Sequence, residues 1–228
     1  MRLIHPHSLA DTLDAVEEAF FLGHPLAAGQ RQQVARWIAG RQGLPGSYAG
    51  MFAPGSRDWD GVAVFTGETT ATHAGVSHIL GEESCRALIR LGNTGASVRK
   101  RLALATQGML HRLQPSGVSS RSVRGMYCCG ICSVAMWRHL TVGGLSESQR
   151  RLTAGMKELK AHRDGRGRWR RFPFWYTLLA LSEIDLPGAR TEMRYAAPHC
   201  ERYLRRVRCN GKYTQRRGLV AERILEKC

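Results

Sequence analysis

The chain has 228 residues, a hydrophobic fraction of 43% and a formal net charge of +16 at pH 7. This length and composition suit one large folded domain or two small ones, and they exclude a disordered polymer. No apolar run approaches the roughly 20 residues that a membrane span needs. Acidic residues also interrupt the N-terminal segment where a signal peptide would be apolar. We therefore expect a cytoplasmic protein without a membrane span.

Apolar residues recur at helical spacing along the first part of the chain. Ser8 is a suitable N-cap for the first helix, and the Gly-, Pro- and aromatic-rich residues 43–67 predict a long ordered loop. Residues 114–125, which are rich in Ser and Gly, predict a linker. The predicted helices of the first part are 9–21, 30–41, 68–80, 82–91 and 97–113.

The helical pattern restarts after the linker. Ser146 or Ser148 is the expected N-cap of the second helix there, and residues 163–173 predict a second Gly- and Arg-rich loop. The predicted helices of the second part are 127–140, 146–162, 174–184, 188–207 and 214–226. No segment alternates as a strand does, so the sequence predicts an all-α fold.

Short matches between the two parts recur in the same order at an offset of roughly 117 residues. Gly46-Ser47-Tyr48 corresponds to Gly167-Arg168-Trp169, and Cys85 corresponds to Cys200. We therefore predict a single helical domain over residues 1–228, made of two related halves, 1–114 and 126–228, joined by the linker at 114–125.

Residues 37–50 read WIAGRQGLPGSYAG, and residues 159–169 read LKAHRDGRGRW and continue into an apolar segment at 172–181. In each, a helix end precedes a Gly-containing turn that places an aromatic residue. This pattern resembles the repeat of the squalene cyclase and protein prenyltransferase superfamily. The resemblance implies an α/α-toroid, or part of one, built of stacked helix pairs. Because the chain is short for a complete ring, two alternatives follow, namely an incomplete ring or a ring that a second copy closes as a homodimer.

The same resemblance implies an enzyme, a lyase, isomerase or transferase, that acts on a small apolar or isoprenoid-like substrate. The Asp-rich motif of the cyclases is absent, and Asp58-Trp59-Asp60 is the nearest approach to it. The candidate acid–base residues are Asp58, Asp60, Glu68 and His73. The alternative is that these residues are a helix-start acid, loop acids and a surface histidine.

The segment Cys128-Cys129-Gly130-Ile131-Cys132 is the sharpest local motif. On a helix, Cys132 shares a face with Cys128 and Cys129, so the thiolates can bind zinc or an iron–sulfur cluster. The candidate metal ligands are Cys128, Cys129, Cys132, Cys200 and Cys209. Two alternatives remain open, namely cysteines that fill tight helix contacts and a redox dithiol.

The positive charge is concentrated in the second part, because residues 1–114 carry a net +2 and residues 115–228 a net +14. Arginines alternate with aromatic residues there, which suits contact with phosphate and stacking on a ring. The candidate residues for binding a substrate or anion are Trp169, Arg170, Arg171, Trp175 and Tyr176. The alternatives are a solvated basic surface and aromatic residues that pack in the core.

Three functional hypotheses follow from the sequence. The first is an enzyme for a small apolar substrate, with or without a phosphate group, and the second is a metalloprotein with a zinc or iron–sulfur centre. The third is a module that binds nucleic acid or an acidic partner through the basic second half.

Overall fold

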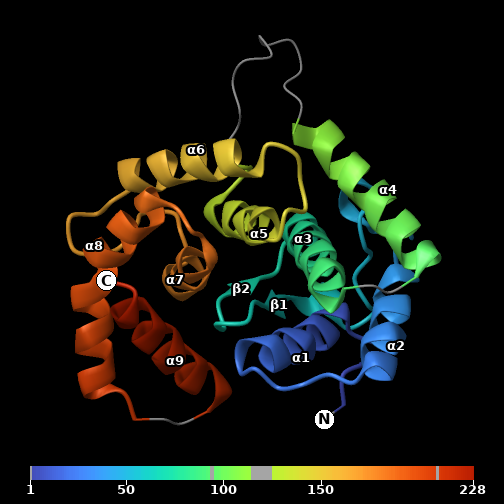
Figure 1. Ribbon diagram of the computed structural model, residues 1–228, viewed down its shortest axis with the longest axis horizontal. Helices are drawn as coiled ribbons and strands as arrows, with labels where there is room; N and C mark the ends of the chain where they lie inside the picture. The colour runs from blue at the N-terminus through green and yellow to red at the C-terminus, as the bar shows by residue number, and fades with distance from the viewer. Residues whose placement is uncertain (1, 93–94, 114–124, 209–210) are drawn as a thin grey trace. The chain divides into compact units, whose positions relative to one another are not determined.

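The computed structural model describes residues 2–92, 95–113, 125–208 and 211–228. In these residues the fold is all-α, as expected, with nine α-helices and one small two-stranded sheet (Figure 1). The predicted linker lies outside the described residues, except for Gly125. The ring arrangement and the homodimer stay predictions.

The chain divides into two compact units, which are described separately. The first unit comprises Met1–Val64, Thr69–Ser120 and Val142–Ser146, and the second comprises Phe65–Glu68, Arg121–Thr141 and Glu147–Cys228. The helices of the first unit are α1 (Leu9–Phe21), α2 (Ala28–Ala39), α3 (His73–Leu91) and α4 (Ala96–Leu113). Its short elements are η1 (Tyr48–Gly50), η2 (Asp58–Asp60), β1 (Val62–Ala63) and β2 (Thr69–Thr70). The helices of the second unit are α5 (Gly130–Thr141), α6 (Ser148–Ala161), α7 (Phe174–Glu183), α8 (Pro187–Arg206) and α9 (Lys212–Glu226).

The N-terminus of α1 is fixed by a buried polar network. The prediction of Ser8 as its N-cap is confirmed, because the Ser8 hydroxyl accepts a hydrogen bond from the Asp11 amide at 2.8 Å. The same hydroxyl donates to Asp58 Oδ1 at 2.7 Å. Asp58 Oδ2 accepts from the amides of Leu9 at 2.8 Å and Gly55 at 2.6 Å. Asp58 therefore ties the loop at 55–58 to the start of α1.

Helix α3 is the central helix of the first unit and packs against α1, α2 and α4 (Figure 1). The prediction of two helices over 68–80 and 82–91 is wrong, because one helix runs from His73 through Gly81 to Leu91. A Cβ at Gly81 would lie 2.5 Å from Met51 Cε, so this glycine admits the Met51 side chain and does not end the helix. Within this all-α fold, Thr69–Thr70 pairs antiparallel with Val62–Ala63 as a small two-stranded sheet.

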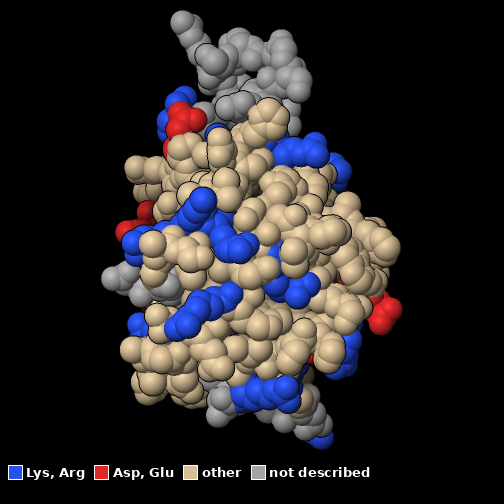
Figure 2. All heavy atoms as spheres, turned by 90° about the vertical axis from the view of Figure 1, so that its right-hand side faces the viewer, with Lys and Arg blue, Asp and Glu red and all other residues tan. Residues whose placement is uncertain are grey.

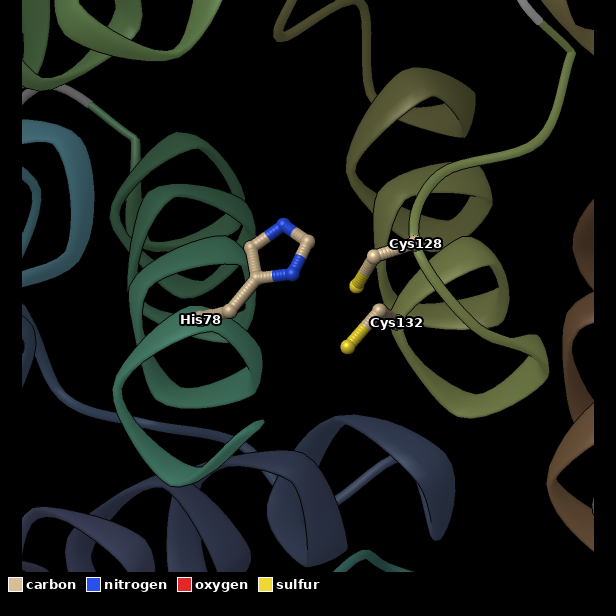
Figure 3. Close-up of side chains that lie close together, drawn as sticks. All are labelled: His78, Cys128 and Cys132. Carbon is tan, nitrogen blue, oxygen red and sulfur yellow. The ribbon is translucent and has the colours of Figure 1, made fainter. Parts of the chain in front are cut away.

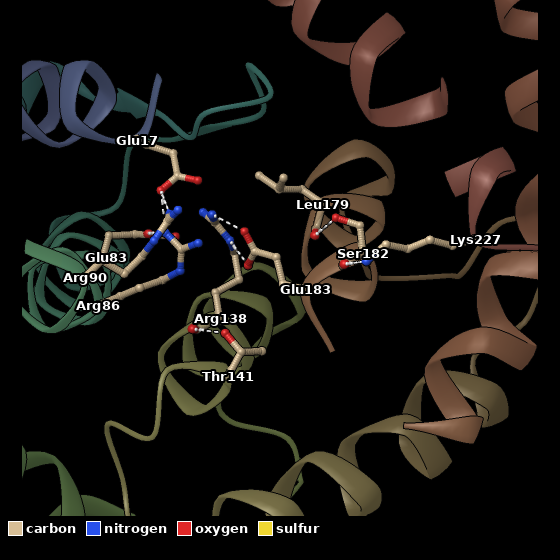
Figure 4. Close-up of polar contacts among 10 residues, drawn as sticks. All are labelled: Glu17, Glu83, Arg86, Arg90, Arg138, Thr141, Leu179, Ser182, Glu183 and Lys227. Atoms are coloured by element: carbon tan, nitrogen blue, oxygen red, sulfur yellow. Dashed lines mark hydrogen bonds and ion pairs between the residues drawn. The ribbon is translucent and has the colours of Figure 1, made fainter. Parts of the chain in front are cut away.

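Buried ion pairs hold α3 and α1 together in the first unit. Glu17 Oε2 pairs with the guanidinium of Arg86 and lies 2.9 Å from Arg90 Nη1 (Figure 4). Arg86 is 3% exposed, so the carboxylates of Glu17 and Glu83, instead of water, stabilise its charge. Removing Glu17 would leave buried positive charge, which makes this group a strong constraint on the α1–α3 contact.

Helix α7 is the central helix of the second unit and packs against α5, α8 and α9 (Figure 1). Arg138 of α5, which is 1% exposed, makes a bidentate ion pair with Glu183, in which both N–O distances are 2.9 Å (Figure 4). The Arg138 guanidinium also lies 5.5 Å from the centre of the Tyr176 ring. These contacts fix α5 along the side of α7.

The predicted starts of α5 and α6 in the second unit differ from the observed ones. Helix α5 begins at Gly130, not at residue 127, because Cys129 provides the carbonyl for the first helical hydrogen bond from Ser133. The N-cap of α6 is Glu147, with a φ of 57°, instead of Ser146 or Ser148. The N-terminal ends of α5 and α6 could not be located from helix periodicity, because both depend on backbone conformation outside the helix.

The two units contain loops of similar local geometry. Gln42 pairs with Phe52 in an isolated antiparallel bridge after α2, and Arg163 pairs with Trp169 in the same way after α6. Gly46 and Gly167, which the sequence matches to one another, both have positive φ, 87° and 90°. A duplication of the two halves stays a prediction that these loops are compatible with.

The bonds of Asp58 predict a large loss of stability when its carboxylate is removed. In Asp58→Ala, the buried amides of Leu9 and Gly55 lose their acceptor, which should lower the free energy of unfolding by about 3 kcal/mol. The measurement is urea unfolding followed by circular dichroism. The matched control is Asp60→Ala, at an exposed position of the same short helix, which should change stability by less than about 0.5 kcal/mol. Equal stability of the two variants would contradict the structural role of Asp58.

Candidate metal centre

The turn that precedes α5 places three cysteines close together. The Cys129 carbonyl accepts from the Ser133 amide at 3.0 Å and from the Ser133 hydroxyl at 2.7 Å. The same hydroxyl accepts from the Tyr127 amide at 2.9 Å. Ser133 therefore closes residues 127–133 into one compact turn, which brings Cys128 and Cys132 to the same side of the helix start.

The start of α5 lies directly against another part of the backbone in the second unit. A Cβ at Gly130 would overlap the carbonyl oxygen of Arg171 and lie 3.0 Å from the Cα of Phe172. Arg171 itself has a positive φ of 68°, which is uncommon for a residue other than glycine. The glycine in the middle of the cysteine motif is thus required by close packing, which fixes the position of the thiols in this unit.

Trp137 fixes α5 one turn further along. Its indole N–H donates to the Gly125 carbonyl at 2.7 Å, and its ring stacks on Phe172 with centroids 5.5 Å apart. A Cβ at Gly155 of α6 would lie 2.5 Å from the indole nitrogen, so only glycine fits there. Because these contacts are buried, the helix that carries the thiols has little freedom to shift.

The three thiols differ in exposure. Cys128 is exposed, Cys129 is half-buried and Cys132 is buried. The Sγ atoms of Cys128 and Cys132 lie within 4.8 Å of each other, and Figure 3 shows both pointing to the same side of the helix start. A hydrogen bond with Cys129, followed by burial and the nearness of Cys129 and Cys128, raises the pKa of the Cys132 thiol. In the absence of a cation, Cys132 is therefore a neutral thiol at neutral pH.

His78, which Figure 3 also draws, belongs to the first unit and has partners there. It is a buried residue of α3, and its Nε2 lies 3.2 Å from Glu82 Oε1 one turn later. Its ring packs on Tyr48 with centroids 4.6 Å apart. A buried imidazole with a carboxylate neighbour has the surroundings that metal-binding histidines commonly have.

The other predicted metal ligands lie elsewhere. Cys200 is buried in α8, and burial, followed by the nearness of Cys228, raises its pKa to about 12. Cys85 is buried in α3 of the first unit, where burial, followed by the nearness of Glu82, raises its pKa. Cys209 lies outside the described residues. Of the five predicted ligands, the structure places the Sγ atoms of Cys128 and Cys132 within 4.8 Å of each other, and the Cys129 thiol is hydrogen-bonded with that of Cys132.

The predicted acid–base residues have mainly structural surroundings. Both carboxylate oxygens of Asp58 accept hydrogen bonds from the start of α1 and the adjoining loop. Glu68, in the second unit, accepts from the Tyr176 amide at 2.9 Å and from the Thr66 hydroxyl at 2.5 Å, so it caps α7. Asp60 and His73 are exposed in the first unit, and the His73 ring packs on Trp59 with centroids 5.0 Å apart.

The predicted anion-binding residues divide into buried and exposed ones. Trp169 is 4% exposed and donates its indole N–H to Glu192 at 2.9 Å, and Tyr176 is fully buried. Trp175 is half-buried and packs on Tyr203 with centroids 4.4 Å apart. Arg170 and Arg171 are exposed. The arginines are therefore accessible to an anion, whereas the rings mainly pack within the unit.

Ser133 and Gly130 decide the position of the thiols, although neither residue was predicted from the sequence to be part of the site. The pattern that contains them is a cysteine pair, then a glycine, then a serine four residues after Cys129. A serine at that spacing can bond to the turn before a helix, and a glycine beside a cysteine can permit close backbone approach. Both functions depend on what the turn packs against, which the sequence does not specify.

None of the described helices combines the length and the apolar character needed to cross a membrane. Comparison of the chain with models of protein families, with curated proteins and with solved structures finds no match.

The exposures and pKa shifts predict an order of thiol reactivity. At pH 8 and without metal, iodoacetamide should modify Cys128 first, because it is exposed and the thiolate is the reactive form. Cys85, Cys132 and Cys200 should react only slowly, because they are buried and their pKa values are raised. Peptide mass spectrometry measures the order, and unfolding in guanidinium should remove the differences. Modification of Cys132 in the native protein as fast as Cys128 would contradict this description of the site.

Proposed function

We propose that this chain is a metalloprotein that binds zinc through the thiolates of Cys128, Cys129 and Cys132. The observation that carries the proposal is the convergence of three thiols at the start of one helix, with two of the Sγ atoms within 4.8 Å of each other. Thiolates are preferred ligands of zinc, and three protein ligands are enough for a zinc site.

The Sγ atoms of Cys128 and Cys132, which lie within 4.8 Å of each other, have a spacing compatible with what zinc requires. Tetrahedral coordination with Zn–S bonds of about 2.3 Å places the sulfurs about 3.8 Å apart. Small rotations about χ1 of Cys128 and Cys132 can bring their Sγ atoms to this separation, without movement of the backbone at Gly130. A rigid backbone with adjustable thiols suits a metal site.

Cys132 lies in the first turn of α5, and Cys128 and Cys129 directly precede this helix. The N-terminus of a helix carries partial positive charge, which stabilises a thiolate nearby. Zinc adds a larger positive charge and overcomes the raised pKa of Cys132 by taking the place of its proton. Zinc binding should therefore release protons and stabilise the second unit.

Zinc is favoured over an iron–sulfur cluster by the number of ligands. Such clusters are usually held by four thiolates. The described residues of the second unit supply three thiols at the start of α5, while Cys200 lies beside Cys228. As part of the same proposal we place the protein in the cytoplasm, where thiols remain reduced.

The proposal predicts one zinc ion per chain and a binding affinity that falls as the pH falls. Because the thiols must lose their protons, binding should release up to about three protons, and acidification should weaken it steeply. Calorimetric titration of the reduced protein in buffers of different ionisation enthalpy measures the stoichiometry and the proton release.

Two variants test the ligands in that titration. Cys132→Ala should weaken zinc binding at least about 100-fold, because it removes one of three thiolates. Cys228→Ser, at an exposed cysteine beside Arg194, is the matched control and should bind zinc as the unchanged chain does. No zinc binding by the reduced protein, or equal binding by both variants, would refute the metalloprotein proposal.

A cavity in the second unit supports a second candidate function, the binding of a small apolar molecule with an anionic group. The cavity has a volume of about 350 Å³ and lies between α6 and α8. Its walls are mainly apolar, from Met156, Leu186 and Pro187, and its lining includes Lys157 and Lys160. Its size is within the range of small-molecule sites.

The lining also includes Glu192, whose carboxylate pairs with Arg163, so the charges of Lys157 and Lys160 favour an anionic group on the ligand. The lining includes the first residues of α8, and no side chain caps that helix terminus. A helix N-terminus and two ammonium groups together suit a phosphate. An isoprenoid-like phosphorylated substrate, which the sequence resemblance implies, combines the apolar and anionic parts that this cavity can accept.

The cavity predicts selective binding of an isoprenoid diphosphate over the corresponding alcohol. The double variant Lys157→Gln/Lys160→Gln should weaken diphosphate binding about tenfold, because it removes two positive charges, and leave the weaker alcohol binding unchanged. Calorimetry measures both ligands. The control is Arg202→Gln, which removes the charge of an exposed residue near the other end of α8. Equal affinity for the diphosphate and the alcohol would exclude this candidate.

A further inference from the structure

The first unit carries an acid-free basic surface that neither proposed function uses. Residues 19–57 and 84–146 contain no Asp or Glu. The acidic residues of this unit lie instead on α1, η2 and α3. Consequently α2 and α4, which pack against one another, carry only positive charge. We call this the α2–α4 face, and its basic residues are Arg31, Arg36, Arg99, Lys100, Arg101 and Arg112.

The basic side chains of this face are accessible. Arg31, Arg36, Arg99, Lys100 and Arg112 are exposed. Figure 2 shows the side of the first unit on which α2 and α4 lie. Lys and Arg are spread over this surface, whereas Asp and Glu appear only near its edges. A surface of one sign without interspersed carboxylates attracts a polyanion, because no charge on it repels phosphate.

A groove opens on the same face, between α4 and the η1 loop. It has a volume of about 600 Å³, and its lining includes Gln42, Leu104, Gln107 and His111. A Cβ at Gly108 would overlap the Ala49 carbonyl oxygen, so α4 lies directly on the loop and the groove has a fixed floor. The Gln42 amide donates to the Gly50 carbonyl at 2.9 Å, which holds the loop in place.

The lining of this groove suits a nucleobase. Gln107 supplies an amide that can both donate to and accept from a base edge. His111 offers a ring for stacking, and Leu104, 45% exposed, offers an apolar surface. These residues recur on one side of α4 at helical spacing, together with Lys100 one turn earlier. Phosphate-binding charges and a base-sized groove therefore lie along one stripe of the helix.

We propose that the α2–α4 face binds single-stranded nucleic acid, with phosphates on its arginines and a base in the groove beside Gln107 and His111. A membrane surface is a poorer match, because the exposed large hydrophobic residues in the described chain are Leu22, Leu44 and Leu104, too few for insertion. Duplex nucleic acid is also a poorer match, because its bases remain stacked and cannot enter a groove.

The test uses the full chain and a fluorescent single-stranded RNA of mixed sequence, with anisotropy measured between 50 and 200 mM NaCl. The triple variant Arg36→Gln/Lys100→Gln/Arg112→Gln should bind at least about tenfold more weakly at 100 mM salt. Because each phosphate contact contributes about 0.7 to the slope of log affinity against log salt, the slope should fall by about 2.

The matched control is Arg202→Gln/Arg205→Gln/Arg206→Gln, which removes the same charge from exposed positions of α8 in the second unit. It should bind RNA within about twofold of the unchanged chain, if the α2–α4 face is the binding surface. An equal loss of affinity in both triple variants would overturn the proposal and indicate attraction by net charge alone. Tighter binding to a duplex of the same sequence would overturn it as well.

A second pair of variants tests the groove without changing the net charge. Gln107→Ala and His111→Ala should each weaken binding to RNA at least about threefold, and leave binding to inorganic polyphosphate unchanged. Equal effects on RNA and polyphosphate would overturn the role of the groove. Circular dichroism of each variant checks that the helices are intact, and repeating the assay on single-stranded DNA shows whether the 2′-hydroxyl contributes.

Discussion

The close approach of Gly130 to the backbone of Arg171 and Phe172 is the constraint on which the candidate metal centre depends. It fixes the first turn of α5 in the second unit, and Trp137, held between Gly125 and Gly155, fixes the next turn. The thiols project from a segment that cannot move without breaking these contacts. A metal site needs such a segment, because the geometry of its ligands has to be held before the ion binds.

The helices could be predicted from the sequence where their limits are local. The Ser8 cap and the span of α1 follow from a capping hydroxyl and a regular apolar stripe, and the structure has both. The break predicted before Glu82 is wrong, because the use of Gly81 depends on Met51, which lies far away in the sequence. The start of α6 at Glu147 likewise depends on an uncommon backbone conformation. Long-range packing therefore accounts for what the sequence could not predict.

The candidate site shows the same division. Helical spacing alone predicts that Cys132 shares a face with Cys128 and with Cys129, and the structure places both of these thiols near that of Cys132. The distant partners depend on tertiary structure, and Cys200 lies beside Cys228 instead. Asp58 and Glu68 have residue types that suit acid–base chemistry, yet both accept bonds from helix N-termini. The net charge of each half predicted anion binding by the second half. The acid-free α2–α4 face, however, lies in the first unit.

X-ray absorption at the zinc edge of the zinc-loaded chain tests the central claim, a thiolate metal centre at the start of α5, most directly. A thiolate site predicts a shell of sulfur neighbours at about 2.3 Å, and this shell should lose intensity in Cys128→Ser/Cys132→Ser. A first shell made of nitrogen and oxygen atoms alone, or a sulfur shell that the double variant leaves unchanged, would contradict it.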